Sequence, residues 1–303
     1  MPRVPTIRQL RYFIALVEHQ HFGHAAEACH VSQSAFSVAI KELENQLEAQ
    51  LVDRTNKQVT VTGAGREFAA GARRILEQLE ALVDNVGGHK GPLEGKLRLG
   101  VIPTIAPFLT PPLLKAARQR YPDLKLYLVE DITRRLYERL MAGEIDLILL
   151  ALPYELRGVE TLSLFHDPFH LAWHRDSTLI TTERHDPEQL PKDAILLLED
   201  GHCLRDHAIS ACRLRDQDKV SRFAATSLIT LIQMVDEDLG VTYLPEMAIG
   251  SSLLSQTDIK TEKLGDDSYR EIGLAWRKNS ARAAEFELLG ELVEASRRAP
   301  VSR

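Results

Sequence analysis

The chain has 303 residues, of which 44% are hydrophobic, and this is enough for about two domains with packed cores. Three cysteines, an odd number, argue against a secreted disulfide framework, so any disulfide would be transient and functional. No run reaches the roughly 18 apolar residues that a membrane span needs, and the first residues lack the pattern of a signal peptide. We therefore expect a soluble cytoplasmic protein with no membrane partner.

Local signals predict three helices at the start of the chain. Residues 6–9 have the form of a capping box, and apolar residues at helical spacing then predict a first helix that ends near His19. A second, alanine-rich helix is expected over residues 23–29. Ser32 is the expected N-cap of a third helix over residues 33–47. The expected core positions of the first two helices are Ile7, Leu10, Ile14, Val17 and Cys29.

The third helix and the segment after it have the features of a winged helix-turn-helix. Residues 53–62 alternate around a polar turn and predict a β-hairpin wing. The first side chains of a recognition helix reach base edges in the major groove, and basic side chains of a wing reach phosphates. The expected inward positions of the third helix are Phe36, Ile40, Leu43 and Leu47. The candidate DNA-contacting residues are Ser32, Gln33, Ser34, Ser37, Lys41, Arg54 and Lys57. A plain helical subdomain with a solvated polar face would show the same pattern.

Charge does not by itself indicate nucleic-acid binding. The formal net charge is −6, and residues 1–62 carry six basic and six acidic side chains. Binding to DNA would therefore require basic groups clustered on one face and the pairing of two subunits.

Residues 64–86 are predicted to form a linker helix with an apolar seam. The mean period of the seam is close to 3.5, so it can pair with its copy in a second subunit or lie on its own domain. The seam consists of Phe68, Ala72, Ile75, Leu79, Leu82 and Val86. A homodimer formed through this helix would present two recognition helices, so the DNA site should be a pair of half-sites. The glycine-rich residues 87–95 cannot continue a helix and are the expected hinge.

From residue 96 onward, predicted strands alternate with helices. The first three strands are expected at 96–102, 125–130 and 146–152, with helices over 107–120 and 134–142 between them. Such alternation is typical of right-handed crossovers and a parallel sheet. Further strands are expected at 169–174, 194–198, 222–225, 241–244 and 272–276. Helices are expected at the cysteines, from 228, and over 282–298.

Two threonines follow the first two of these strands. Thr104 and Thr133 each open a predicted helix, where a hydroxyl and free backbone N–H groups can hold a small polar molecule. Ligands of open α/β sheets bind beyond the carboxyl ends of the strands. An ordinary N-cap role would by itself explain the threonines, and they become candidates for binding peroxide when a reactive cysteine faces the same cleft.

Two of the three cysteines, Cys203 and Cys212, lie nine positions apart. Cationic neighbours such as His202 and Arg205, with His207 and Arg213 further on, favour a thiolate. A thiolate with a second cysteine within reach is typical of a redox sensor, in which peroxide forms a sulfenic acid and the partner resolves it to a disulfide. Two small buried hydrophobic side chains are the alternative.

Residues 25–65 resemble the winged helix-turn-helix of LysR-type transcriptional regulators. The resemblance is carried by the alanine pair, V-S-Q at the turn, L-E two helical turns on, D-R-T in the wing and T-x-x-G at the end. Val38 departs from the commonly polar or basic residue of that family. The resemblance implies a regulatory domain with two lobes, similar to periplasmic binding proteins. The expected domains are 1–62 (DNA binding), 63–88 (dimerising helix), 89–95 (hinge) and 96–303 (redox sensing), with lobe I at 96–165 and 269–303 and lobe II at 166–268.

The segments LLEDGHCLRDHAISAC and RFAATSLITLIQMVDEDLGVTYLP resemble the hydrogen-peroxide-sensing OxyR branch of that family. This resemblance implies that Cys203 reacts with peroxide and that Cys212 resolves it. It also places Thr104, Thr133, His202 and Arg270 around the peroxide. A homotetramer, RNA polymerase and a cellular dithiol reductant are the further partners expected.

The cysteine spacing makes a physical demand. A disulfide needs Cα atoms within about 7 Å, whereas nine residues of helix at 1.5 Å each span roughly 13 Å. Oxidation should therefore rearrange the segment from Cys203 to about Lys219. Peroxide would be consumed once per cycle, so we expect a sensor that is not an enzyme and that needs no cofactor or metal. The alternatives are a regulator of the same family that responds to a small organic anion, and a thiol peroxidase that turns over.

Overall fold

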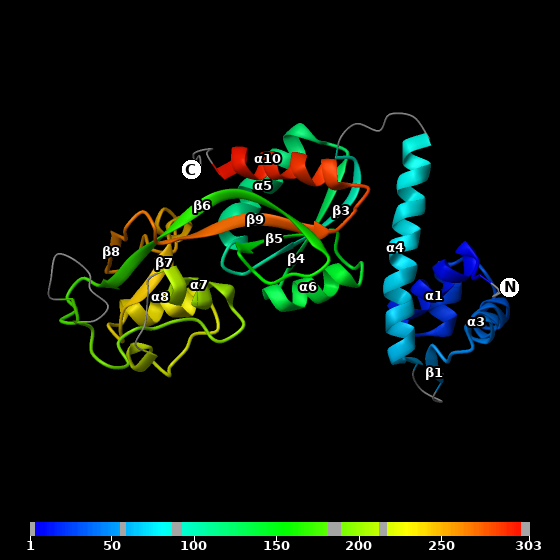
Figure 1. Cartoon of the computed structure of the whole chain (residues 1–303), viewed down its shortest axis with the longest axis horizontal. Helices are drawn as coiled ribbons and strands as arrows, with labels where there is room; N and C mark the ends of the chain where they lie inside the picture. The colour runs from blue at the N-terminus through cyan, green and yellow to red at the C-terminus, as the bar shows by residue number, and fades with distance from the viewer. Residues whose placement is uncertain (1–3, 55–58, 87–92, 181–188, 212–216, 298–303) are drawn as a thin grey trace. The chain divides into compact units, whose positions relative to one another are not determined.

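The computed structural model describes residues 4–54, 59–86, 93–180, 189–211 and 217–297 (Figure 1). Two compact units can be distinguished. The first contains the chain to Gly91 and also the short segment Arg139–Glu144. The second contains the rest of the chain from Pro92 onward. None of the helices in the described ranges is long and apolar enough to cross a membrane.

The N-terminal unit contains the three predicted helices and a small hairpin. Its elements are α1 (Ile7–His19), α2 (Phe22–Ala28), α3 (Gln33–Leu47), β1 (Val52–Arg54), β2 (Val59–Val61) and α4 (Gly63–Val86). The capping box is confirmed, because Thr6 Oγ1 accepts from Gln9 N and Gln9 Oε1 accepts from Thr6 N. Ser32 caps α3 by accepting from Ala35 N at 3.3 Å. Local signals therefore located these helix starts correctly.

The buried face of α1 agrees with the predicted one only in part. Leu10 is buried as predicted, and Ile14 and Val17 pack partly buried against the core, whereas Ile7 is 43% exposed. Phe13 and Leu16 complete the buried face, and Phe13 contacts Phe68 at 5.4 Å between ring centroids. Of the four positions predicted inward on α3, Phe36, Ile40 and Leu43 are buried and Leu47 is half-buried.

The hairpin is held against α3 by hydrogen bonds. β1 and β2 pair antiparallel, and Glu44 Oε1 of α3 accepts from Leu51 N at 2.9 Å and from Val52 N at 3.2 Å. Gly65 lies against the same segment, where an added Cβ would come within 2.1 Å of Leu51 O. The hydrogen bonds to the Glu44 side chain and the close approach of Gly65 therefore set the orientation of the hairpin.

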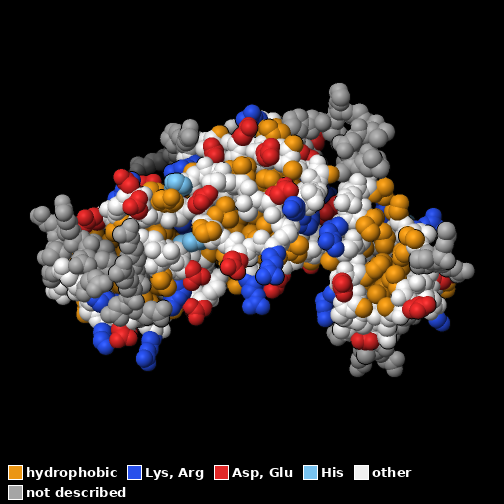
Figure 2. Space-filling model, viewed as in Figure 1, with side chains coloured by type: hydrophobic (Ala, Val, Ile, Leu, Met, Phe, Trp, Pro, Cys, Tyr) orange, Lys and Arg blue, Asp and Glu red, His pale blue; other side chains and the backbone are white. Residues whose placement is uncertain are grey.

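The linker helix α4 uses part of its apolar seam within its own unit. Phe68 packs on the core of the unit, but Ile75 is 51% exposed. In Figure 2, apolar side chains gather on the face of the N-terminal unit along which α4 runs. The first part of the seam therefore packs within its own unit, whereas pairing of the rest with a second subunit stays a prediction. The side chains of Leu82 and Val86 lie outside the described set.

The second unit is built around a mixed sheet. Its strands are β3 (Gly95–Val101), β4 (Leu124–Glu130), β5 (Leu147–Leu152), β6 (Val159–His174), β7 (Thr242–Pro245), β8 (Ile259–Lys263) and β9 (Tyr269–Arg277). Its helices are α5 (Ala106–Arg120), α6 (Thr133–Met141), α7 (Cys203–Ala211), α8 (Leu228–Asp236), α9 (Glu246–Ile249) and α10 (Ala283–Arg297), with a 3₁₀ turn at Gln217–Lys219. The strand order is β4-β3-β5-β9-β6-β7, and β8 also pairs with β6.

The first three strands form the expected parallel arrangement, but the sheet as a whole is mixed. Only β3 pairs parallel, with β4 and with β5, whereas β9 runs antiparallel to both β5 and β6. β6 starts ten residues earlier than predicted because Val159–Pro168 pairs with β9, and from Phe169 it pairs with β7 and β8 instead. The predicted strands 194–198 and 222–225 form isolated bridges rather than regular strands.

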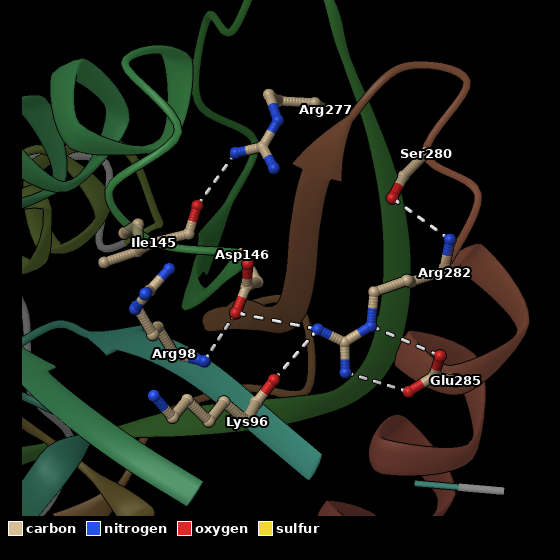
Figure 3. Close-up of polar contacts among 8 residues, drawn as sticks. All are labelled: Lys96, Arg98, Ile145, Asp146, Arg277, Ser280, Arg282 and Glu285. Atoms are coloured by element: carbon tan, nitrogen blue, oxygen red, sulfur yellow. Dashed lines mark hydrogen bonds and ion pairs between the residues drawn. The ribbon is translucent and has the colours of Figure 1, made fainter. Parts of the chain in front are cut away.

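A polar cluster closes the end of the sheet where β3 and β5 begin (Figure 3). The buried carboxylate of Asp146 accepts from Arg98 N at 2.6 Å and lies 3.9 Å from Arg282 Nη1. Arg282 also donates to Lys96 O at 3.0 Å and pairs with Glu285 at 2.9 Å. These contacts join α10 to the start of β3, which leaves the opposite, carboxyl ends of the strands to form a site.

Candidate functional site

Four of the predicted peroxide-site residues lie at the same edge of the sheet, next to a strand terminus or at the start of a helix. Thr104 is in the turn between β3 and α5, Thr133 is the first residue of α6, Cys203 is the first residue of α7, and Arg270 is the second residue of β9. All are buried, with exposed fractions of 1–4%. The placement of both threonines beyond strand ends follows the sequence prediction.

Arg270 is the centre of the hydrogen-bond network. Its Nη1 donates to Thr104 Oγ1 at 2.9 Å, and its Nη2 donates to Thr104 O at 3.0 Å. The N-cap of α5 is Ile105, which has no side-chain capping bond, so the alternative explanation of Thr104 as an ordinary cap does not hold. Since the Thr104 oxygen accepts from Arg270, its own proton stays available for donation to a small polar molecule.

Asp167 and Met247 complete this network, and neither was predicted from the sequence. Asp167 is paired with Arg270 across β6 and β9, and its Oδ2 accepts from Arg270 Nε at 2.9 Å. Its Oδ1 accepts from Met247 N at 3.1 Å, and Met247 Sδ lies 3.3 Å from Arg270 Nη2. Asp167 is 1% exposed, so the ion pair is fully buried. The register between β6 and β9 brings Asp167 to Arg270, and α9 brings Met247 to both.

The environment of Cys203 has opposing effects on its thiol. Burial raises the pKa of Cys203 above the usual value. The Thr133 hydroxyl, the Arg270 guanidinium and the backbone at Ala151 act in the other direction and favour the thiolate, while Asp206 disfavours it. Because burial is the largest effect, the thiol is held mainly in its neutral form at pH 7.

The cation that acts on Cys203 is not one of its sequence neighbours. Arg205 pairs with Asp200 at 3.0 Å and donates to Leu198 O at 3.3 Å. His202 is half-buried, and within the described part of the chain its ring forms no hydrogen bond or ion pair. Arg213 lies outside the described residues. The expectation that flanking cations activate the thiol is therefore wrong for Arg205, and Arg270 of β9 takes that place.

Two polar atoms near Cys203 are buried without a hydrogen-bond partner in the described structure: Thr133 Oγ1 and His207 Nδ1. The Thr133 hydroxyl stabilises the Cys203 thiolate, yet it forms no hydrogen bond of standard geometry in this form. Burying an unpaired polar atom is costly, so a native site usually supplies a partner, which can be water or a bound molecule. A small molecule with hydrogen-bond donors and acceptors would supply one.

The helix after Cys203 begins the segment that should rearrange. α7 runs from Cys203 to Ala211, which corresponds to about 12 Å of helical rise. Cys203 is a free thiol. Cys212 lies outside the described residues, so its pairing with Cys203 stays a prediction.

The predicted DNA-contacting side chains lie on one side of α3. Ser32, Gln33, Ser34 and Lys41 are exposed, and Ser37 is half-buried. Ser32 Oγ and Ser34 Oγ lie 3.1 Å apart in a shared hydrogen bond. Val38 is 57% exposed on the same helix. Arg54 ends β1, but its side chain, like the whole of Lys57, falls outside the described set.

Comparisons with known proteins agree with this arrangement. A model of the bacterial regulatory helix-turn-helix protein, lysR family, matches residues 7–66, and a model of the LysR substrate binding domain matches residues 90–297. Both halves of the chain therefore match one family.

Similar proteins and structures point in the same direction. A probable hydrogen peroxide-inducible genes activator from Streptomyces viridosporus is 40% identical over 99% of this chain and 97% of its own length. The DNA-binding transcriptional dual regulator OxyR from Escherichia coli K12 is 35% identical over 95% of each chain. A full-length OxyR variant from Pseudomonas aeruginosa matches with a TM-score of 0.82 and 32% identity, over 99% of this chain and 100% of that structure.

Proposed function

Since the chain belongs to the LysR family of transcriptional regulators, we propose that it binds DNA and controls oxidative-stress genes in response to hydrogen peroxide. The main structural support for the peroxide response is that a buried thiol, Cys203, lies beside the Arg270 guanidinium and the Thr133 hydroxyl, which has no hydrogen-bond partner of standard geometry. The similarity to peroxide-responsive relatives along nearly the whole chain supports the same function.

The proposed reaction begins at the sulfur of Cys203. The thiol loses its proton, the thiolate attacks one peroxide oxygen, and the O–O bond breaks, so that sulfur is oxidised to a sulfenic acid and the second oxygen leaves as water. Thr104 and Thr133 would donate hydrogen bonds to the peroxide, with His202 at the edge of the site. Arg270 would stabilise the negative charge on the leaving oxygen. The Cys212 thiol would then attack the sulfenic sulfur, forming the disulfide and releasing a second water.

Disulfide formation would act as the conformational switch. Because α7 spans about 12 Å, the two sulfurs can meet only if the helix unwinds or shifts. A dithiol reductant would reverse the change. The protein would therefore work as a stoichiometric sensor rather than an enzyme.

The DNA-binding side of the proposal needs two subunits. Pairing along α4, with Ile75 in the contact, would place two copies of α3 on paired half-sites. Gln33 would contact bases, Ser32, Ser34, Ser37 and Lys41 would contact bases or phosphates, and Arg54 and Lys57 would contact phosphates from the wing. A tetramer and contact with RNA polymerase would complete the regulatory assembly.

The test follows thiol chemistry and DNA binding in the full-length protein. We expect equimolar peroxide to produce a Cys203–Cys212 disulfide, detected by mass spectrometry, and to change the DNA footprint. Cys203→Ser should retain DNA binding without any response, and Cys212→Ser should stop at a sulfenic acid that dimedone traps. Cys29→Ser is the matched control and should respond like the wild type. A Cys203→Ser protein that still responds to low peroxide would refute the assignment.

A second candidate function is a response to a small organic anion held at the helix N-termini near Thr104 and Thr133. The buried Thr133 hydroxyl at the first residue of α6 favours this alternative, because a hydroxyl and free backbone N–H groups at a helix start can hold a carboxylate. The two functions differ in kinetics: a Cys203 thiol that reacts with peroxide no faster than free cysteine supports the anion. A thiol peroxidase would instead show repeated turnover with a thioredoxin-like reductant.

A further inference from the structure

His207 is placed one helical turn after Cys203. Both residues are on α7, four positions apart, so their side chains lie on the same face of the helix. Helical side chains lean toward the N-terminus, so His207 points toward the turn that contains Cys203. Both residues also contact the backbone at the end of β5, Cys203 at Ala151 and His207 at Pro153. No other histidine occurs within α7.

The hydrogen bonding of His207 determines which ring nitrogen carries the proton. His207 Nε2 lies 3.2 Å from Pro153 O. A carbonyl oxygen can only accept, so Nε2 is the donor, and in the neutral ring the lone pair is on Nδ1. Nδ1 is buried and has no hydrogen-bond partner among the described residues. The ring therefore presents a basic nitrogen whose acceptor position is free.

Burial, assisted by the charge of Arg270, keeps this ring neutral. Burial lowers the pKa of His207, the Pro153 carbonyl raises it, Arg270 of β9 lowers it, and Asp206 of α7 raises it. Tyr154, in the connection after β5, also lies near Cys203 and Asp206. Burial raises the pKa of Tyr154, and the charges of Cys203 and Asp206 raise it further. With burial as the largest effect on His207, the ring is mainly unprotonated at pH 7.

We propose that His207 Nδ1 accepts the thiol proton of Cys203 during oxidation by hydrogen peroxide. This inference rests on the proposed function and adds a residue to it. The proton moves from Sγ to Nδ1 through the bound peroxide, because Nδ1 has no direct hydrogen bond to Sγ. Sulfur then forms a bond to one peroxide oxygen while the O–O bond breaks. The departing hydroxide takes the proton back from Nδ1 and leaves as water, so the ring ends neutral and the sulfur is oxidised by two electrons.

The environment of the thiol explains why a base is needed. Burial holds Cys203 in its neutral form, and Arg205, the nearest arginine in the sequence, is engaged with Asp200. Arg270 stabilises charge but cannot accept a proton. A neighbouring neutral imidazole removes the proton only when the sulfur reacts, which leaves the resting thiol protected.

The experiment compares His207→Gln with the wild type in the reduced full-length protein. Glutamine can still donate to Pro153 O but cannot act as a base. The rate of Cys203 sulfenic acid formation by peroxide is measured by stopped flow between pH 5 and 10. At pH 7 the variant should react roughly 100-fold more slowly, within the usual range for loss of a general base. Its rate should rise about tenfold per pH unit and reach the wild-type rate where the thiol ionises by itself.

The outcomes separate this inference from the proposed function. A matched control, His174→Gln on β6, should follow the wild-type pH profile. If wild-type Cys203 reacts no faster than free cysteine, the proposed function fails. If the wild type reacts quickly and His207→Gln shows the same rate and pH profile, only the role of His207 is overturned. A variant that stays slow at high pH would show damage to the site instead of a lost base, and would also overturn the role.

Discussion

The buried pair of Asp167 and Arg270 gives the sharpest prediction about the architecture of the site. Asp167→Ala removes the acceptor of Arg270 Nε and of Met247 N while the guanidinium stays buried at 1% exposure. Leaving one charge of a buried pair without its partner costs about 3–5 kcal/mol of unfolding free energy. With a urea m value of about 2 kcal/mol/M, the unfolding midpoint should fall by roughly 2 M.

Urea unfolding of the reduced protein, followed by circular dichroism, measures this loss. The double variant Asp167→Leu/Arg270→Met removes both charges and should lie within about 2 kcal/mol of the wild type, because no unpaired charge stays buried. Glu138→Ala breaks an exposed pair with Arg134 and should cost at most about 1 kcal/mol. If Asp167→Ala loses no more than this control, water or another group solvates the guanidinium, and the account of a rigidly held Arg270 is refuted.

The other predictions address peroxide, DNA and assembly. Thr104→Val keeps the side-chain shape but removes the acceptor of Arg270 Nη1, so oxidation of Cys203 should slow by about tenfold or more without unfolding; unchanged stopped-flow rates would exclude a role in binding peroxide. Gln33→Ala should weaken binding to a specific site by about 1–3 kcal/mol and leave non-specific binding nearly unchanged, as measured by fluorescence anisotropy at fixed salt. Ile75→Asp should reduce dimerisation in analytical ultracentrifugation, and an unaltered dimer would show that this part of α4 faces solvent.

The DNA-binding unit could be predicted from the sequence almost element by element. The capping box at Thr6, the Ser32 N-cap and the boundaries of α3 are set by residues within a few positions of one another. Local signals of this kind do not depend on the rest of the fold. The apolar face of α1 was less predictable, because the choice between two adjacent edges depends on contacts such as that between Phe13 and Phe68.

The site could be predicted only in part, because its partners come from distant strands. The cysteine motif and the strand ends located Cys203, Thr104 and Thr133. Asp167 instead depends on β6 running antiparallel to β9, and no local pattern before Phe169 predicts this long strand. An aspartate followed by proline in an apolar segment is normally assigned to a loop, so the counter-ion of Arg270 was missed.

Burial of Cys203 has two opposite consequences for its sulfur: it limits access by other molecules, and it lowers the fraction of reactive thiolate. An exposed fraction of 4% keeps large thiols and bulky oxidants from the sulfur, but the same burial raises its pKa and reduces the thiolate at pH 7. A small uncharged oxidant loses little hydration on entering such a site, and the Thr133 hydroxyl and the Arg270 guanidinium then act at short range in a medium of low polarity. In the proposed function, selectivity for peroxide would follow from size and charge, whereas speed would depend on groups that act once the oxidant is bound. A thiol that was activated permanently by flanking cations would gain speed and lose that selectivity.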